Sequence, residues 1–173
     1  KGITVMRTDS HSFGAFRYFI VPCEQMSLFD TVEEKRATAV NSFFSQLAEM
    51  KKRNWEIKGK KHLLVCNTKL SEDIFICKFS KETTKTIFKE SDDDIENVDE
   101  PDYPFIYVIF DTARQIALIE LKTSVFSSLN QAKEKLKVCF QKTFTLFGFE
   151  VLFEEITDSS TFWNFVSDSY GVY

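Results

Sequence analysis

The chain has 173 residues, of which 43% are hydrophobic and 28% charged, and its net charge at pH 7 is −4. This length suits a single domain with a substantial core, and the composition is typical of a globular rather than a disordered chain. No apolar run approaches the roughly 20 residues of a membrane helix, and no secretory signal is apparent, so we expect a cytoplasmic protein with no membrane partner. The acidic balance excludes general attraction to nucleic acid, so any phosphate binding requires a local patch.

The chain has 19 Phe, 4 Cys and only 2 His. A structural zinc site needs about four Cys or His ligands at close spacing, and these residues are scattered, so no metal or other cofactor is expected. Free, mostly buried thiols are the interpretation we favour. His11 and His62 lie in no Ser or Cys nucleophile motif, and no glycine-rich phosphate loop is present.

The N-terminal third contains one predicted strand and one predicted helix. Residues 15–22 alternate as a strand does, and residues 3–6 are a candidate hairpin partner. Thr31 followed by Glu34 is typical of a capping box. Apolar residues then recur at steps of three and four, which predicts a long helix over 31–54 with Lys51, Lys52 and Arg53 in its last turn.

The middle of the chain is predicted to be an antiparallel meander. Four short segments rich in β-branched and aromatic residues are separated by turns too short for crossover helices: 55–59, 62–70, 73–80 and 84–90. The acidic segment 90–102 follows and is expected to be a solvated loop. It lacks the glycine and glutamate of a calcium-binding loop.

The remaining elements complete an α+β fold. A hairpin over 101–122 is followed by an amphipathic helix, which Ser127 or Ser128 caps and Gly148 ends. A strand over 149–156 and a short aromatic helix over 160–169 come next. We therefore predict one domain over 1–173, with a mostly antiparallel meandering sheet, two long amphipathic helices and a short C-terminal helix. The ending at 171–173 resembles a strand start, which leaves open that this domain begins a longer protein.

The hairpin also raises the possibility of a nuclease. Asp102 follows a proline, and Glu120 and Lys122 lie two apart on one strand face, as metal-dependent nucleases of the PD-(D/E)xK type arrange them around magnesium. With the turn at 112–115, Asp111 is opposite Ile116 and Glu120 is opposite Tyr107. This register directs Asp102 to the other face of the sheet, so the sequence disfavours the nuclease without excluding it.

The strongest nucleic-acid candidate is the basic stretch 51–61. Its cations and one aromatic side chain predict phosphate contacts beside a base-stacking platform; the residues are Lys51, Lys52, Arg53, Trp55, Lys58, Lys60 and Lys61. The alternative is a helix C-terminus followed by an exposed hairpin, two ordinary places for lysine.

The C-terminal segment is unusually aromatic. Phe162, Trp163 and Phe165 lie on the predicted short helix, which is too apolar to face water on every side. These residues either close the core or bind a partner, such as a second copy of the chain.

The order of elements over residues 60–168 resembles that of RexA-like and abortive-infection phage-exclusion proteins. The resemblance rests on the hydrophobic order of the strands at 62–80, the hairpin ending in Thr123, Ser124, Val125 and Phe126, and the helix, strand and aromatic helix that follow. It implies a DNA-associated or partner-sensing module of prokaryotic antiviral defence and provides no catalytic residue. Our leading hypothesis is thus a non-enzymatic nucleic-acid- or partner-binding domain. The alternatives are the nuclease and a protein–protein interaction or oligomerisation domain.

Overall fold

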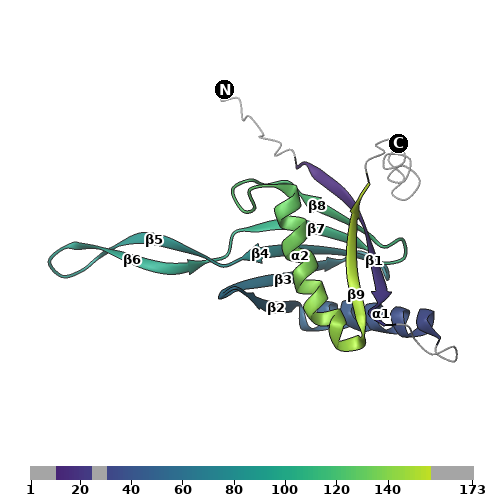
Figure 1. Ribbon diagram of the computed structural model, residues 1–173. Helices are drawn as coiled ribbons and strands as arrows, with labels where there is room; N and C mark the ends of the chain where they lie inside the picture. Colours follow the sequence, from purple (N-terminus) through teal and green to yellow (C-terminus); the bar gives the residue numbers. More distant parts are fainter. Residues whose placement is uncertain (1–10, 25–30, 157–173) are drawn as a thin grey trace, which may run out of the picture.

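The structure is a computed structural model that describes residues 11–24 and 31–156, and it confirms the α+β class (Figure 1). In chain order the elements are β1 (Phe13–Pro22), α1 (Val32–Met50), β2 (Lys52–Ile57), β3 (Lys60–Lys69), β4 (Ile74–Lys81), β5 (Thr83–Glu90), β6 (Ile95–Asp102), β7 (Phe105–Asp111), β8 (Ile116–Glu120), α2 (Leu129–Phe144), the 3-10 helix η1 (Thr145–Phe147) and β9 (Phe149–Glu155). The predicted strand at 3–6 and the short helix at 160–169 lie outside the described residues.

Seven strands form one antiparallel sheet in the order β2-β3-β4-β7-β8-β1-β9. The prediction of an antiparallel sheet is confirmed, but the simple meander is wrong. It stops at β4, because β5 leaves the sheet and β7 takes the place beside β4. The first strand, β1, lies between β8 and β9, where it is central to the C-terminal half of the sheet.

Both helices pack on one face of this sheet. In α1 the rings of Phe43 and Phe44 meet Phe140 of α2, with centroids 5.1 and 6.3 Å away. Phe44 and Phe140 also contact Phe110 of β7, so strand and helices share one aromatic core. Most of the buried phenylalanines therefore lie in the layer between the helices and the sheet.

The helix boundaries agree with the predictions at three of four ends. Ser128 caps α2 by accepting the Gln131 N–H at 3.1 Å, and Gly148 follows η1 with a positive φ of 81°. At the start of α1, Thr31 donates its hydroxyl to Glu34 at 2.7 Å instead of capping the backbone. The predicted end of α1 is wrong: the helix ends at Met50, and Lys51 turns the chain with a φ of 65°.

The structure also differs from the prediction in a hairpin arm, formed by β5 and β6. The acidic segment was expected to be a loop, yet β6 forms there and pairs with β5 along its whole length, from Thr83 opposite Asp102 to Glu90 opposite Ile95. The two strands form a separate sheet that projects from the body (Figure 1). Only Ile95 and Val98 are apolar in β6, so the local sequence carries no strand pattern, and the pairing partner makes the strand.

Among the described residues, none of α1, α2 and η1 has the length and hydrophobicity of a transmembrane segment.

Candidate nucleic-acid interface

The face of the sheet opposite the helices, here called the open face, carries a row of aligned side chains. Lys52 on β2 is paired with Val65 on β3, Val65 with Lys78 on β4, and Lys78 with Tyr107 on β7. Directly opposed residues in antiparallel strands project from the same face. The row therefore places two lysines and a tyrosine on one surface, although Lys52 and Tyr107 are 55 positions apart in the sequence.

Phe105 is the centre of this surface. The ammonium of Lys78 lies 4.5 Å from the centroid of its ring, and that of Lys122 lies 5.4 Å away. Tyr107 meets the same ring edge-on at 5.5 Å. The rings of Phe105 and Tyr107 are half-buried, so part of each remains in contact with solvent. We call this set the aromatic–lysine surface: Lys52, Lys78, Phe105, Tyr107 and Lys122.

Glu120 adjoins this surface but is committed to structural contacts. It is buried, with 5% of its surface exposed, and both carboxylate oxygens are occupied. Oε1 lies 2.5 Å from His11 Nδ1, and Oε2 accepts the backbone N–H of Tyr107 at 2.7 Å. The predicted hairpin register is confirmed, with Asp111 opposite Ile116 and Val108 opposite Ile119. Glu120 consequently fastens the end of β8 to β7.

The structure does not assemble the predicted nuclease residues around a common point. Asp102 ends β6 in the arm and pairs with Thr83, whereas Glu120 belongs to the seven-stranded sheet. Lys122 shares the open face with Glu120 but contacts Phe105. Nowhere in residues 11–24 and 31–156 do three His, Cys, Asp or Glu side chains gather as metal ligands do.

The predicted basic stretch is divided by the alternation of β2 and β3. Lys52 and Lys61 project to the open face, whereas Lys60 projects to the helix face with its neighbour His62. Lys51 occupies the turn after α1, and Lys58 the turn between the two strands, each with positive φ. The stretch therefore supplies two lysines to the aromatic–lysine surface and its border, not one continuous patch.

Trp55 and Arg53 face the helices, which removes Trp55 as a stacking platform. The Trp55 indole N–H donates to the Thr143 hydroxyl at 3.0 Å, and its ring lies stacked 6.5 Å from Phe43. Arg53 donates to Gln46 at 3.1 Å and lies 5.5 Å from the same Phe43 ring. Both side chains join β2 to the helices, so their role is packing.

Lys78 and Phe105 were not among the predicted site residues. Lys78 is the one charged residue inside the apolar run 74–79, and it projects opposite to the buried Cys77 and Phe79. A lysine inside an otherwise apolar strand is a signal for a solvent-facing side of a sheet. The proximity of β4 to β7 was the missing information, because only that pairing brings Lys78 over Phe105.

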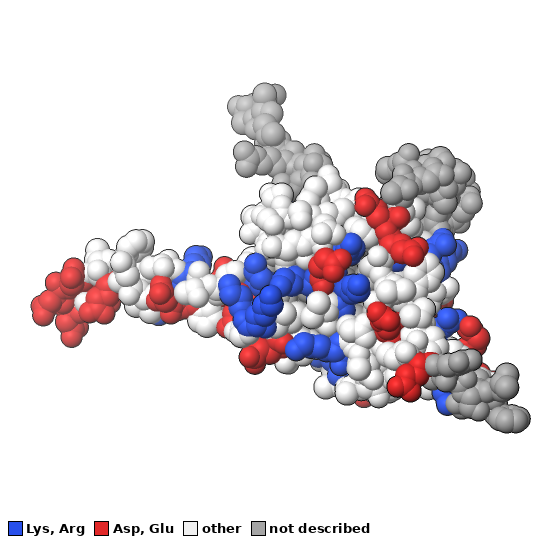
Figure 2. All heavy atoms as spheres, viewed as in Figure 1, with Lys and Arg blue, Asp and Glu red and all other residues white. Residues whose placement is uncertain are grey.

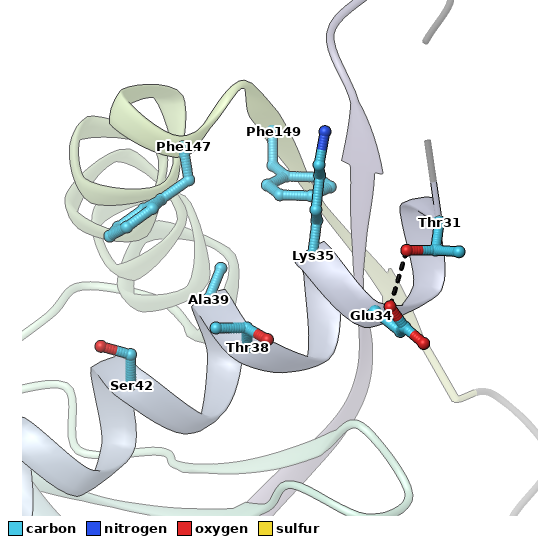
Figure 3. A pocket seen from close by; sticks show the side chains of 8 residues that line it. All are labelled: Thr31, Glu34, Lys35, Thr38, Ala39, Ser42, Phe147 and Phe149. Carbon is cyan, nitrogen blue, oxygen red and sulfur yellow. Dashed lines mark hydrogen bonds between the residues drawn. The ribbon is translucent and has the colours of Figure 1, made fainter. Parts of the chain in front are cut away.

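A pocket lies on the helix side, between α1 and the segment from η1 to β9 (Figure 3). Its volume is about 530 Å³, and Phe147 and Phe149 form one wall opposite Thr38 and Ala39. Glu34 at its rim is engaged by the Thr31 hydroxyl. The groove thus offers apolar walls without a set of converging polar groups, so we assign it no chemistry.

The charge of the chain is strongly segregated. The arm, residues 83–102, contains eight acidic residues and two lysines, a net −6, which leaves +2 for the rest of a chain whose total is −4. Figure 2 shows acidic side chains gathered at the tip of the arm and basic ones where the arm joins the body. The overall charge is therefore a poor guide to the body, which is mildly basic.

Comparison with known protein families, with curated proteins and with solved structures gives no match.

Proposed function

We propose that this chain is a non-enzymatic binding module whose aromatic–lysine surface takes up single-stranded nucleic acid. The observation that carries the proposal is the Phe105 ring held between the ammonium groups of Lys78 and Lys122 on a sheet face that neither helix covers. Aromatic rings with flanking cations on an open sheet are the arrangement that stacks bases and tracks phosphates.

The dimensions of the surface suit a short strand of nucleic acid. From β2, with Lys52, to the end of β8, before Lys122, the sheet crosses four strand spacings, about 19 Å. At about 3.4 Å per nucleotide this corresponds to roughly six stacked bases. Lysine stems that now cover Phe105 are flexible and exchange readily for a base, which leaves their ammonium groups beside the phosphates.

Segregated charge supports the proposal as well. The negative charge that argued against phosphate binding is concentrated on the arm, and the acid nearest the surface, Glu120, is engaged by His11 and Tyr107. A body with a net charge of +2 attracts polyanions at close range and low salt, where screening is weak.

The test is fluorescence anisotropy of a labelled single-stranded DNA of about twelve nucleotides, titrated with protein at several salt concentrations. We expect log K to fall with log salt with a slope of about −0.7 per phosphate neutralised. Lys78→Ala and Lys122→Ala together should make that slope shallower by about 1.4. Phe105→Ala should weaken binding by about 5- to 150-fold, the usual range for one stacked base.

Lys142→Ala is the matched control, because this lysine lies on α2 and donates to the Glu56 carbonyl at 2.7 Å, away from the open face. It should leave both affinity and salt slope unchanged. Binding that is absent, insensitive to salt, or equally weakened by Lys142→Ala would refute the proposal.

The role in antiviral defence implied by the resemblance to phage-exclusion proteins remains a prediction, as does a cytoplasmic location. Phe162, Trp163 and Phe165, the predicted partner-binding residues, lie outside the described residues. A nucleic-acid-binding module would fit a defence system, and the same binding measurement made with phage DNA against host DNA would distinguish a sensor from a general binder.

A further inference from the structure

The arm formed by β5 and β6 exposes an apolar face. Phe88 and Ile95 are 75% and 67% exposed, and both project from the same side of the hairpin as Thr86 and Pro101. Ile87 and Val98 are opposed to each other on the other side and are half-buried. Two apolar side chains on one side of an isolated hairpin mark that side as a contact surface.

This hairpin has no partner in the described part of the chain. β5 and β6 pair only with each other, and a two-stranded hairpin alone is marginally stable in water. Cross-strand polar contacts stabilise it in part. Lys89 pairs with Glu100 at 2.5 Å, and the Thr86 hydroxyl donates to Asp99 at 2.7 Å.

The root of the arm is fixed to the body. Glu82, between β4 and β5, donates its backbone N–H to the Lys61 carbonyl at 2.8 Å, and its carboxylate accepts the Lys61 N–H at 3.1 Å. On the returning strand, the Pro104 carbonyl accepts the Ser80 hydroxyl at 2.7 Å. The arm therefore leaves the body in a defined direction, which reduces the entropy lost when it docks.

Opposite charges occupy the two ends of the arm. Asp92, Asp93 and Asp94 lie in the turn at its tip, whereas Lys81 ends β4 just before the root and Lys60 begins the neighbouring strand β3. Figure 2 shows acidic side chains at the tip and basic ones where the arm joins the body. The two lysines flank His62, which is paired with Lys81 across β3 and β4 and follows Lys60 by two residues on β3. We call Lys60 and Lys81 the root lysines.

We propose that the arm is a self-association device that docks antiparallel on the arm of a second copy. A two-fold axis through the middle of the arm, near Phe88, brings the two apolar faces together and places each acidic tip at the root of the partner's arm, which the root lysines border. Such a contact is isologous, with the same patch used by both copies, and it closes as a dimer.

A second copy satisfies both features of the arm at once. The apolar face requires an apolar partner. The arm is basic at its root and acidic at its tip, so it is complementary to a second arm that runs in the opposite direction. A two-fold axis relates two arms in this way. A purely basic partner would match the tip alone. The root lysines project toward the helix face and so are separate from the aromatic–lysine surface, which makes this inference independent of the proposed function.

The test is sedimentation velocity on the whole chain without nucleic acid, at concentrations from about 1 to 100 µM, the range of a small interface. We expect the mass to rise from one chain to two. Phe88→Ser should weaken the dimer by at least about tenfold, because it removes the central apolar contact. Leu146→Ser is the matched control: Leu146 is 83% exposed but lies on η1, so the dimer should persist.

Charge reversal gives the decisive readout. A tip variant, Asp92→Lys with Asp93→Lys, and a root variant, Lys60→Glu with Lys81→Glu, should each be monomeric. Mixed together they should form a heterodimer, because each lysine tip meets a glutamate root and each acidic tip meets a lysine root. Asp94 is left in place because it accepts the Ile95 N–H at 2.7 Å in the turn.

Misfolding of either variant would not be repaired by mixing, so recovery of a dimer identifies the contact itself. A wild-type chain that stays monomeric throughout the concentration range, or reversed variants that dimerise as the wild type does, would overturn the proposal.

Discussion

Glu120 Oε2 accepts the backbone N–H of Tyr107 at 2.7 Å, at the point where the ladder between β7 and β8 ends. The same carboxylate holds His11 through its other oxygen. Glu120 is a buried acid with both oxygens bonded, and its bond to Tyr107 links β8 to β7. This residue of a nuclease-like motif therefore has a structural role here.

Glu120→Ala should lower the free energy of unfolding by about 1–3 kcal/mol, because it leaves a backbone N–H without its acceptor. Urea unfolding followed by circular dichroism measures the loss, and the exposed Glu96 replaced by Ala is the control. Magnesium should not change the melting temperature of the wild type. A rise with magnesium that Glu120→Ala abolishes would contradict this structural role and favour a metal site.

Trp55→Phe should reduce stability by about 1 kcal/mol while leaving affinity for single-stranded DNA unchanged. The substitution removes the N–H that donates to Thr143 but keeps a ring next to Phe43. Parallel denaturation and anisotropy measurements separate the two effects. Weakened DNA binding with unchanged stability would restore Trp55 as a stacking platform.

The hairpin around Asp111 shows what the sequence predicts well. Its alternation and its short turn at 112–115 are local, and together they determine which residues oppose one another. Asp111 then fixes the turn by accepting both the backbone N–H and the guanidinium of Arg114, each at 3.0 Å. Helix limits at Ser128 and Gly148 are predictable for the same reason, because caps are local.

The aromatic–lysine surface was not predictable, because it depends on which strands become neighbours. Lys78 and Phe105 meet only because β5 and β6 leave the sheet and let β7 pair with β4. The inward direction of Trp55 depends in the same way on where β2 joins the sheet relative to the helices. Non-local pairing has no signature in a short window of sequence.

The four cysteines should differ sharply in reactivity. Burial, reinforced by the neighbouring Cys66, raises the pKa of the Cys77 thiol, and burial raises that of Cys139 to about 12 despite the nearby lysines. Protonated, enclosed thiols react slowly, whereas Cys23 is exposed. A thiol reagent at pH 8 should label one cysteine rapidly in the native protein and four in denaturant. Rapid labelling of more than one native thiol would contradict the packing.

Stability should fall as the pH is lowered below 6.5, owing to His62. Burial, followed by the positive charges of Lys135, Lys81 and Lys60, lowers the pKa of this residue below its usual 6.5, although the bond from its ring to the Lys60 carbonyl acts in the opposite direction. Above pH 6.5 the imidazole is neutral in both folded and unfolded chains. As the pH falls toward the lowered folded-state pKa, only the unfolded chain takes up the proton, so the balance shifts toward unfolding.

Two variants test this assignment by denaturant unfolding at pH 7.5 and pH 5. His62→Phe retains an aromatic ring beside Phe79, whose centroid lies 6.2 Å away, and should make the drop in unfolding free energy between the two pH values smaller. Lys81→Gln keeps His62 but removes one of the charges that depress its pKa, so it should reduce the same drop partly. An unaltered pH dependence in both variants would show that other groups control it.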